Sequence, residues 1–224
     1  GGSDTTAVAL AVAVGGATEI YTDVSGVFTT DPRVVPVARR MTRISFDEML
    51  EMCAAGCPKP AMRAVEFART HGVRLHVRSA FTWEPGTWIT EEESEMEDAI
   101  VSGVVGDDSE AKITITNVPD QPGVAAKVFR ALASADVNVD MIVQNVSEQG
   151  HTDISFTRPA DELGHVLPLT EQVANEIGAD RVLSDASIAK VSLVGAGMKT
   201  NPGVAAPVFE TLAANGINIE MIST

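Results

Sequence analysis

The sequence predicts an α/β domain with a largely parallel sheet, followed by two small α+β modules of βαββαβ type, the second of them incomplete. Three observations lead to this fold class. Helical and β-branched runs alternate through residues 1–90, a dense acidic stretch follows, and a sequence motif then occurs twice. Alternation of strand and helix favours a parallel sheet, whereas a repeat of this length indicates a duplicated structural unit.

The first 90 residues supply the elements of the α/β domain. Ser3 or Asp4 can cap the first predicted helix. Ser45 and Glu48 have the spacing of a capping box, which predicts that another helix starts there. The predicted elements are a helix over 5–14, strands over 19–22 and 27–30, helices over 45–55 and 62–71, and a strand over 74–78.

An acidic stretch separates this domain from the rest of the chain. We interpret so dense a charge as a solvated linker over residues 91–108, and a metal-binding acidic loop is the alternative. The acids concerned are Glu84, Glu91, Glu92, Glu93, Glu95, Glu97 and Asp98.

The repeat is the most informative feature of the sequence. Pro122–Ala126 recurs as Pro202–Ala206, an offset of 80 positions, and at the same offset Asp140-Met-Ile matches Glu220-Met-Ile. These copies place one module at residues 109–187 and a truncated one at 188–224. The elements predicted for the first module are strands over 112–118, 152–157 and 181–184, a further strand that starts at Asn138, and helices after residue 122 and over 161–177.

The repeat also carries a possible ligand site. Asp120–Gly123 and Thr200–Gly203 place a polar residue and free backbone amides at a turn from strand to helix, which suits the carboxylate of a small ligand. Asn138 and Asn218, predicted at the start of the next strand, can reach the same place. A purely structural duplication explains the repeat equally well.

Three segments of the α/β domain are candidates for chemistry. Gly1–Asp4 precedes a helix and can cradle an anion, although a plain helix cap is an equal interpretation. Thr22 and Asp23 end a strand, and Asp31-Pro32-Arg33 places a cation suited to phosphate after a rigid turn. The alternative for the last segment is a solvated turn with an internal ion pair.

Two cysteines and two histidines, Cys53, Cys57, His71 and His76, lie close to the spacing of a zinc site. The context contradicts zinc, because Cys53 falls inside a predicted helix and His76 inside a predicted strand. We therefore predict no metal site and interpret the cysteines as packed thiols, kept reduced in the cytoplasm.

Charge and hydropathy exclude several classes of partner. The chain has 16 basic and 31 acidic residues, a net charge of −15, which disfavours binding to nucleic acid or to anionic lipid. No run of apolar residues approaches the length of a membrane span. Both ends of the sequence fall inside predicted structure, so we expect a piece of a longer protein.

Taken together, these segments resemble actinobacterial aspartate kinase (aspartokinase) across nearly the whole chain. The resemblance rests on residues 1–7 (GGSDTTA), 21–33 (YTDVSGVFTTDPR), 63–69 (RAVEFAR), 109–112 (SEAK), 120–147 and 190–199 (KVSLVGAGMK). It implies the C-terminal part of an amino-acid-kinase domain at 1–90, of the carbamate-kinase-like fold, followed by two ACT regulatory modules. It also implies phosphorylation of the L-aspartate β-carboxylate by ATP with Mg²⁺, the first step towards lysine (through diaminopimelate), threonine and methionine.

The resemblance assigns roles to individual residues. Ser3 and Asp4 would be catalytic, and Gly1, Gly2 and Ser3 would bind aspartate. The ATP site would comprise Thr22, Asp23, Phe28, Asp31, Arg33 and Lys59. Threonine or lysine, as feedback effectors, would bind Asp120, Asn138, Val139, Asp140, Gln144, Val204, Ala205, Asn218 and Ile219.

The resemblance further implies an assembly through the ACT modules, either a homo-oligomer or an α/β hetero-oligomer whose shorter subunit starts near Met96. The family's amino-terminal lysine and the end of its second module are absent, so we expect no catalysis by these residues alone. Pro58 stands where the family has a phosphate-binding lysine, with Lys59 one position later. Proline supplies neither charge nor an N–H, so a weakened paralogue that acts as an amino-acid-sensing ACT subunit is the alternative function.

Overall fold

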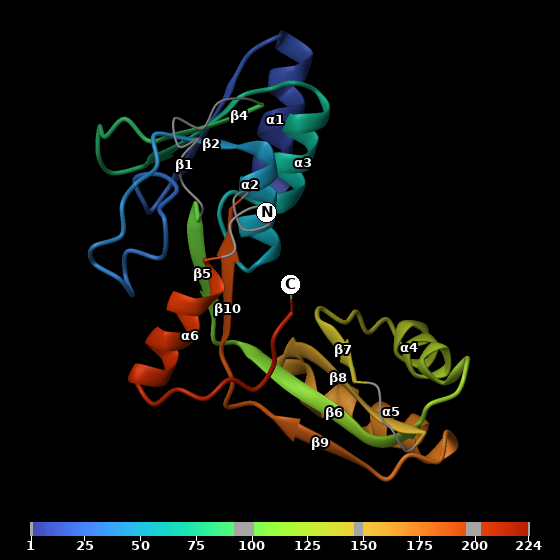
Figure 1. Ribbon diagram of the computed structural model, residues 1–224. Coiled ribbons are helices and arrows are strands. Elements are labelled where there is room, and N and C mark those ends of the chain that lie inside the picture. Colours follow the sequence, from blue (N-terminus) through green and yellow to red (C-terminus); the bar gives the residue numbers. More distant parts are fainter. Residues whose placement is uncertain (1, 92–100, 146–149, 196–202, 224) are drawn as a thin grey trace. The chain divides into compact units, whose positions relative to one another are not determined.

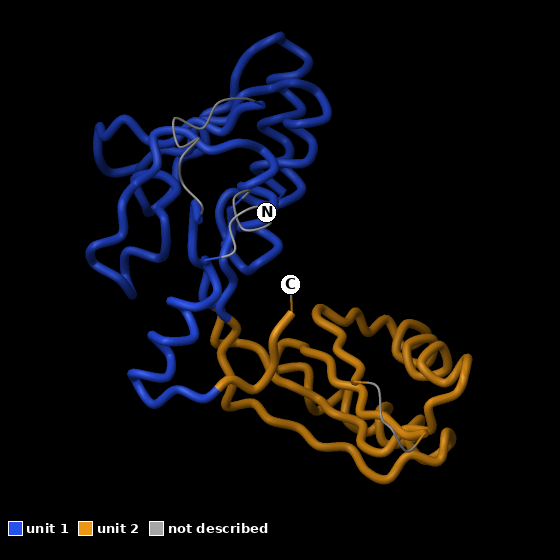
Figure 2. Tube along the Cα trace, viewed as in Figure 1, with its two compact units in different colours: residues 1–106, 191–218 blue, residues 107–190, 219–224 orange. Residues whose placement is uncertain are grey.

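The computed structural model describes residues 2–91, 101–145, 150–195 and 203–223. The chain divides into two compact units (Figure 2). Unit 1 comprises residues 1–106 and 191–218, and unit 2 comprises residues 107–190 and 219–224.

Unit 1 is built on a four-stranded sheet with the strand order β1-β3-β4-β2. Its strands are β1 (Thr18–Thr22), β2 (Arg43–Ser45), β3 (Leu75–Ser79) and β4 (Thr87–Thr90). The β1–β3 and β2–β4 pairs are parallel, as the sequence predicts, whereas β3 and β4 are antiparallel. The loop from β3 to β4 is too short for the crossover that parallel neighbours need.

Three helices pack together beside this sheet (Figure 1): α1 (Gly2–Val14), α2 (Phe46–Ala54) and α3 (Met62–Thr70). The predicted capping box at the start of α2 is confirmed, because Ser45 Oγ accepts from the Glu48 N–H at 3.2 Å and the Glu48 carboxylate accepts from the Ser45 N–H at 3.3 Å. Alternate residues of β1 are buried against the helices. Val8, Met49 and Val65 are wholly buried in the core that results.

Two predictions for this region need correction. Residues 27–30 do not form a strand. Phe28 makes an isolated antiparallel bridge with Arg40, flanked by backbone hydrogen bonds from Met41 to Val27 and from Thr29 to Arg39. The pairing goes no further at Val27, because its N–H donates to the Thr87 side chain. Within the stretch 91–108 assigned to a linker, β5 (Gly103–Asp107) is a strand that pairs with β10 (Lys190–Val194). Residues 92–100 of that stretch lie outside the described residues.

Unit 2 has the predicted βαββαβ order. Its elements are β6 (Glu110–Pro119), α4 (Val124–Ser134), β7 (Ile142–Gln144), β8 (His151–Pro159), the short helix η1 (Ala160–Glu162), α5 (Leu163–Glu176) and β9 (Arg181–Asp185). The antiparallel sheet has the order β7-β8-β6-β9, and α4 and α5 cover one of its faces (Figure 1). Ile113, Ile154 and Phe156 of the sheet are buried against Leu132 and Val166 of the helices.

The second copy of the repeat is described in part. Its helix, α6 (Ala205–Ala214), forms as predicted. Residues 217–223, predicted as a strand, are neither strand nor helix. Within this segment, Glu220 contacts Lys112 through its side chain, at 2.7 Å.

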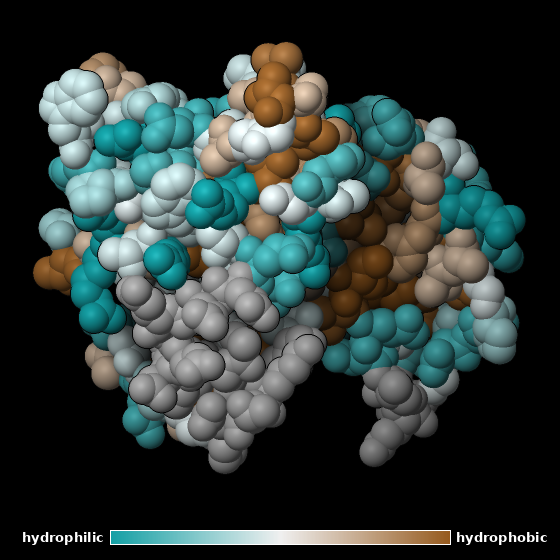
Figure 3. Space-filling view, turned by 90° about the horizontal axis from the view of Figure 1, so that it is seen from above, coloured by the Kyte–Doolittle hydropathy of each residue, from teal (hydrophilic) through white to brown (hydrophobic). Residues whose placement is uncertain are grey.

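Several large apolar side chains are exposed. On the face drawn in Figure 3, hydrophobic side chains interrupt a largely hydrophilic surface. Phe81 and Trp83, in the loop between β3 and β4, are among the most exposed large apolar side chains, at 81% and 92%. Among the described residues, no helix combines the length and the apolar character that a membrane crossing requires.

Candidate functional site

The predicted nucleotide residues begin at the carboxyl end of β1. The hydroxyl of the buried Thr22 donates to the Asp23 carboxylate at 2.9 Å, and Asp23 itself is exposed. The Thr22 carbonyl accepts from the Ala80 N–H at 2.8 Å, which ties the loop after β3 to the end of β1. The carboxyl ends of adjacent parallel strands are a common place for ligands in α/β folds.

Asp31 and Arg33 form a two-point ion pair in the segment that follows. Arg33 Nη2 lies 2.7 Å from Asp31 Oδ2 and Arg33 Nε lies 3.0 Å from Asp31 Oδ1. The hydrogen bond from Arg33 lowers the pKa of Asp31, and the same bond raises the pKa of Arg33. The charge of Asp23 makes a smaller contribution in the same direction. The internal ion pair that we gave as the alternative for this segment is therefore present, and its arginine is exposed.

The loop that carries Lys59 is held by the chain on both sides of it. The Cys57 thiol donates to the Lys59 carbonyl and the Cys53 thiol to the Pro60 carbonyl, each at 3.4 Å. Lys59 itself is exposed. Burial raises the pKa of the Cys57 thiol.

Both cysteines are partly buried against the core of unit 1. Burial raises the pKa of Cys53 to about 12, with a smaller contribution from Cys57. The other two residues of the zinc-like set face elsewhere: His71 Nδ1 contacts the Phe67 carbonyl at 2.9 Å, and His76 Nδ1 contacts Glu19 at 3.2 Å.

Asp4 joins the start of α1 to the start of α3. Its side chain is buried, at 8% exposed, and its Oδ2 accepts from the Ala61 N–H at 3.1 Å. The prediction that Asp4 caps its own helix is therefore wrong. The helix α1 begins at Gly2, before Asp4, and the Asp4 carboxylate accepts from the backbone that follows Lys59 instead. Ser3 is exposed and its hydroxyl lies 3.4 Å from Asp4 Oδ1.

The remaining residues predicted to bind aspartate give less information. Gly2 is the exposed first residue of α1, and no described atom lies within 4 Å of the Cβ that a larger residue would place there. Gly1 lies outside the described residues.

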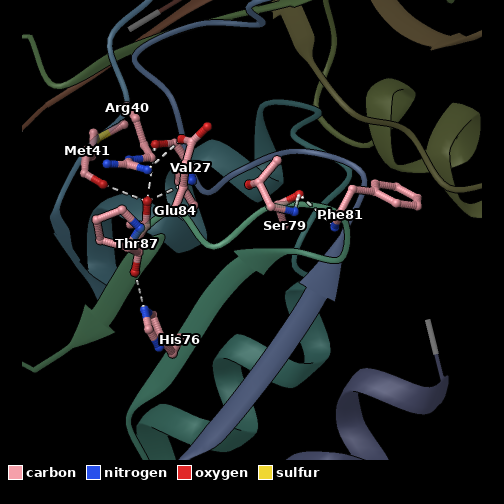
Figure 4. A network of polar contacts seen from close by, with 10 residues as sticks. Val27, Arg40, Met41, His76, Ser79, Phe81, Glu84 and Thr87 are labelled. Atoms are coloured by element: carbon pink, nitrogen blue, oxygen red, sulfur yellow. Dashed lines mark hydrogen bonds and ion pairs between the residues drawn. The ribbon is translucent and has the colours of Figure 1, made fainter.

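A buried threonine, which the sequence did not reveal, holds the segment between Asp23 and Arg33 (Figure 4). Thr87 is fully buried, and its hydroxyl accepts from the Val27 N–H at 2.8 Å and donates to the Met41 carbonyl at 2.6 Å. Gly26 packs so closely that an added Cβ would lie 2.5 Å from this hydroxyl oxygen. The half-buried Phe28 follows directly. Thr87 is one polar residue in a strand, so no sequence signal distinguishes it.

The loop between β3 and β4 is fixed at several points (Figure 4). Ser79 Oγ accepts from the backbone N–H groups of Phe81 and Thr82, at 3.0 and 3.2 Å. Farther along the loop, Glu84 forms an ion pair with Arg40 at 2.9 Å. The loop beside Thr22 is thus held in one conformation.

The predicted effector residues of the first module partly converge. Asp120 and Gln144 line a cavity of about 330 Å³ at the turn from β6 to α4. Gly123, with φ at 92°, makes this turn in a conformation that favours glycine and places the amide end of α4 at the cavity. Such a cavity has the polar groups and the size to hold a small amino acid.

The other effector residues of this module lie on the approach to β7. Asn138 does not start a strand as predicted, because β7 begins at Ile142. Neither Asn138 nor Val139 is among the residues that line the cavity. Asp140 forms an ion pair with Lys190 at 2.6 Å.

The second copy contributes its candidates separately. Val204 precedes α6 and Ala205 opens it, and both belong to unit 1 with Asn218. Ile219 belongs to unit 2. The predicted turn at residues 200–202 lies outside the described residues.

Comparison with known families divides the chain in the same order. The amino acid kinase family matches residues 1–79, and ACT domains match residues 112–175 and 191–224.

Individual relatives are aspartokinases. The aspartokinase of Mycolicibacterium smegmatis is 53% identical over all of this chain and 54% of its own length. A crystal structure of aspartokinase alpha and beta subunits is 45% identical with a TM-score of 0.51, and it covers 55% of this chain and 81% of its own.

The structures of E. coli aspartokinase III match the whole chain. The complex with aspartate and ADP is 28% identical with a TM-score of 0.80, covering 50% of that protein. The complex with lysine and aspartate is 29% identical with a TM-score of 0.75, covering 49%. This chain therefore spans about half the length of the curated relatives it matches.

Proposed function

The chain belongs to the aspartate kinase family, and from this premise we propose that the complete protein transfers the γ-phosphoryl group of ATP to the β-carboxylate of L-aspartate. The observation that carries the proposal is the polar end of β1 in unit 1. The buried Thr22 hydroxyl donates to the exposed Asp23 carboxylate there, and the segment that follows carries the exposed Arg33, paired with Asp31. The related aspartokinase III, crystallised with aspartate and ADP, supports the choice of substrates.

The residues present fit a nucleotide. Arg33 and Lys59 are exposed cations, and the amide ends of α1 and α3 meet at the Asp4–Ala61 hydrogen bond. Cations and helix amide ends are the groups that bind phosphate. Phosphoryl transfer requires mainly that the groups be positioned and that charge on the phosphoryl oxygens be neutralised.

Each group would contribute one part of that work. Arg33 and Lys59 would bind phosphate oxygens, and the exposed Asp23 carboxylate would face the metal that accompanies the nucleotide. Mg²⁺ would supply further neutralisation of phosphate charge, with most of its ligands from phosphate and water. Ser3 and Gly2, beside the start of α1, are the proposed aspartate contacts. Asp4 would act by holding the Lys59 loop.

Feedback regulation is the second part of the proposal. The cavity that Asp120 and Gln144 line would take the effector, with its carboxylate at the amide end of α4. Lysine is supported by the aspartokinase III complex, and threonine follows from the resemblance alone. The ACT modules would also join subunits, as the alpha and beta subunits of a related aspartokinase suggest. We keep the domain limits 1–90, 109–187 and 188–224, and a cytoplasmic location, as proposals.

One sequence difference favours a second candidate function. Pro58 stands where the family resemblance places a lysine, and the exposed Lys59 is one residue later. If Lys59 does not reach the phosphates, the protein would be a weakened paralogue that senses amino acids. The 53% identity to an aspartokinase over the whole chain makes the working kinase our preferred candidate.

The test uses the complete open reading frame. We expect aspartate-dependent release of ADP and, with hydroxylamine present, an aspartyl hydroxamate, because hydroxylamine captures an acyl phosphate. Lys59→Ala should reduce kcat/KM for ATP by about 100-fold, the loss of a charged contact to a phosphoryl group. Activity absent in the natural protein but restored by Pro58→Lys would establish the second candidate instead.

The effector site has its own control. Asp120→Ala should relieve inhibition by threonine or lysine, since it removes a polar group from the cavity wall. Unchanged inhibition would remove Asp120 from the site.

A further inference from the structure

Two ion pairs join the two copies of the repeat, and in each of them a lysine of one copy contacts a carboxylate of the other. Lys112, at the start of the first copy, lies 2.7 Å from Glu220 of the second. Lys190, at the start of the second copy, lies 2.6 Å from Asp140 of the first. Because Asp140 and Glu220 occupy matching positions of the repeat, each lysine contacts the equivalent carboxylate of the other copy.

The segments before the two lysines also match in detail. Asp107 Oδ1 accepts from the N–H and hydroxyl of Ser109, at 2.9 and 2.6 Å. Asp185 Oδ1 accepts from the same two groups of Ser187, at 2.8 and 2.6 Å. The repeat thus extends to the pattern Asp-x-Ser-x-Ala-Lys, and both lysines leave the same kind of turn. This equivalence makes either lysine a matched control for the other.

The two lysines differ in one respect. Lys190 has a second carboxylate, Glu110, whose Oε1 lies 3.5 Å from Lys190 Nζ. Glu110 is 8% exposed in its side chain, and its Oε2 is buried without a hydrogen-bond partner. The residue that matches Glu110 in the second copy is Ile188. Lys190 therefore contacts both a buried acid and Asp140. Lys112 has no such acid at the matching position.

Lys190 is the first residue of β10, and its side chain contacts Asp140 of the effector segment. The chain passes from one unit to the other at residues 106–107 and 190–191, so Lys190 stands at one of these crossings. Asp140 is also held by its backbone, whose N–H donates to the Thr157 carbonyl at 3.2 Å. From Asp140 the chain continues directly to Gln144 at the cavity wall.

We propose that Lys190 is a positioning residue of the amino-acid site in the first module, which it completes from the second repeat by holding Asp140 and the segment 138–144. The amino-acid ligand in this statement rests on the proposed function. The ion pair itself does not. Loss of the pair frees Asp140, which is 48% exposed in its side chain, while Glu110 still holds Lys190. The ligand site would then loosen without exposing a buried charge.

The experiment combines two measurements on the complete protein. Amide hydrogen exchange over residues 138–144 reports the segment without any ligand, and the concentration of threonine or lysine that half-inhibits ADP release reports the site. Each inhibition curve is scaled to the uninhibited rate of the same variant. The variants are Asp140→Asn, Lys190→Met, both together, and Lys112→Met as the matched control.

We expect Asp140→Asn and Lys190→Met each to speed exchange over 138–144 and to weaken the effector about tenfold, within the usual range of coupling between sites. The double variant should be no weaker than Lys190→Met, because Asp140→Asn removes only a contact that Lys190→Met has already removed. Lys112→Met should leave exchange over 138–144 unchanged.

Three outcomes would overturn the proposal. These are a Lys190→Met protein with normal exchange and inhibition, a double variant whose effect is the product of the two, or equal effects of Lys112→Met. If Lys190→Met does not fold, hydrogen exchange of the Asp140→Asn variant tests the proposal by itself, because Glu110 still pairs with Lys190 in that variant. If the natural protein binds neither amino acid, the proposed effector fails, but the exchange measurement still tests the positioning role.

Discussion

The two units hold their candidate binding residues in different ways. In unit 1, segments far apart in the sequence meet at buried polar groups, such as Val27 and Met41 at the Thr87 hydroxyl. In unit 2, a single turn between β6 and α4 supplies Asp120 and most of the cavity wall. The comparison teaches that the first site depends on long-range contacts, whereas the second is encoded locally and can therefore be repeated.

Removing the Thr87 hydroxyl should have the largest effect. Thr87→Val keeps the shape but leaves a buried N–H and a buried carbonyl unpaired, which costs about 3 kcal/mol. We expect a clearly lower melting temperature and loss of nucleotide binding. Thr82→Val, an exposed residue in the same unit, is the control and should change neither. A stable Thr87→Val protein with normal nucleotide affinity would mean that the Thr87 hydroxyl is not needed to hold the segment after Asp23.

Asp4 provides a finer test of the same dependence. Asp4→Ala removes the acceptor of the Ala61 N–H, at a cost of about 1–2 kcal/mol, and should raise KM for ATP about tenfold by releasing the Lys59 loop. Asp4→Asn keeps an oxygen at that place and should retain most of the activity. Steady-state kinetics distinguishes a structural role of Asp4 from a catalytic one. Equal, large losses of kcat in both variants would mean that the negative charge of Asp4 takes part in catalysis.

How much the sequence could predict follows from the same contrast. The capping box at Ser45, the βαββαβ order of unit 2 and the turn at Asp120 are local patterns, and the structure contains each of them. The bond from Ala61 to Asp4 joins residues 57 positions apart, so no local pattern contains it. The strand predicted over 27–30 is reduced to a single bridge, and the Val27 N–H there donates to the side chain of Thr87, 60 positions away, which no local pattern reveals.

The smallest predicted effect concerns the local site. Gly123→Ala meets no described atom within 4 Å, so its cost comes only from the backbone, with φ at 92°, and should be about 1–2 kcal/mol. Gly164→Ala is the same change inside α5, where alanine should stabilise by about 0.5 kcal/mol. Thermal melting of the two variants should shift in opposite directions, and a shared direction would contradict the local account of this turn.

The most direct test of two separate sites is amide hydrogen exchange on the complete protein with one ligand at a time. With ADP and Mg²⁺, we predict added protection over residues 22–33 and 57–61, and little over 118–125. With lysine or threonine, we predict protection over 118–125 and 138–144. Protection by ADP confined to the modules, or by the amino acids confined to residues 22–33, would contradict the assignment of a nucleotide site to unit 1 and an effector site to unit 2.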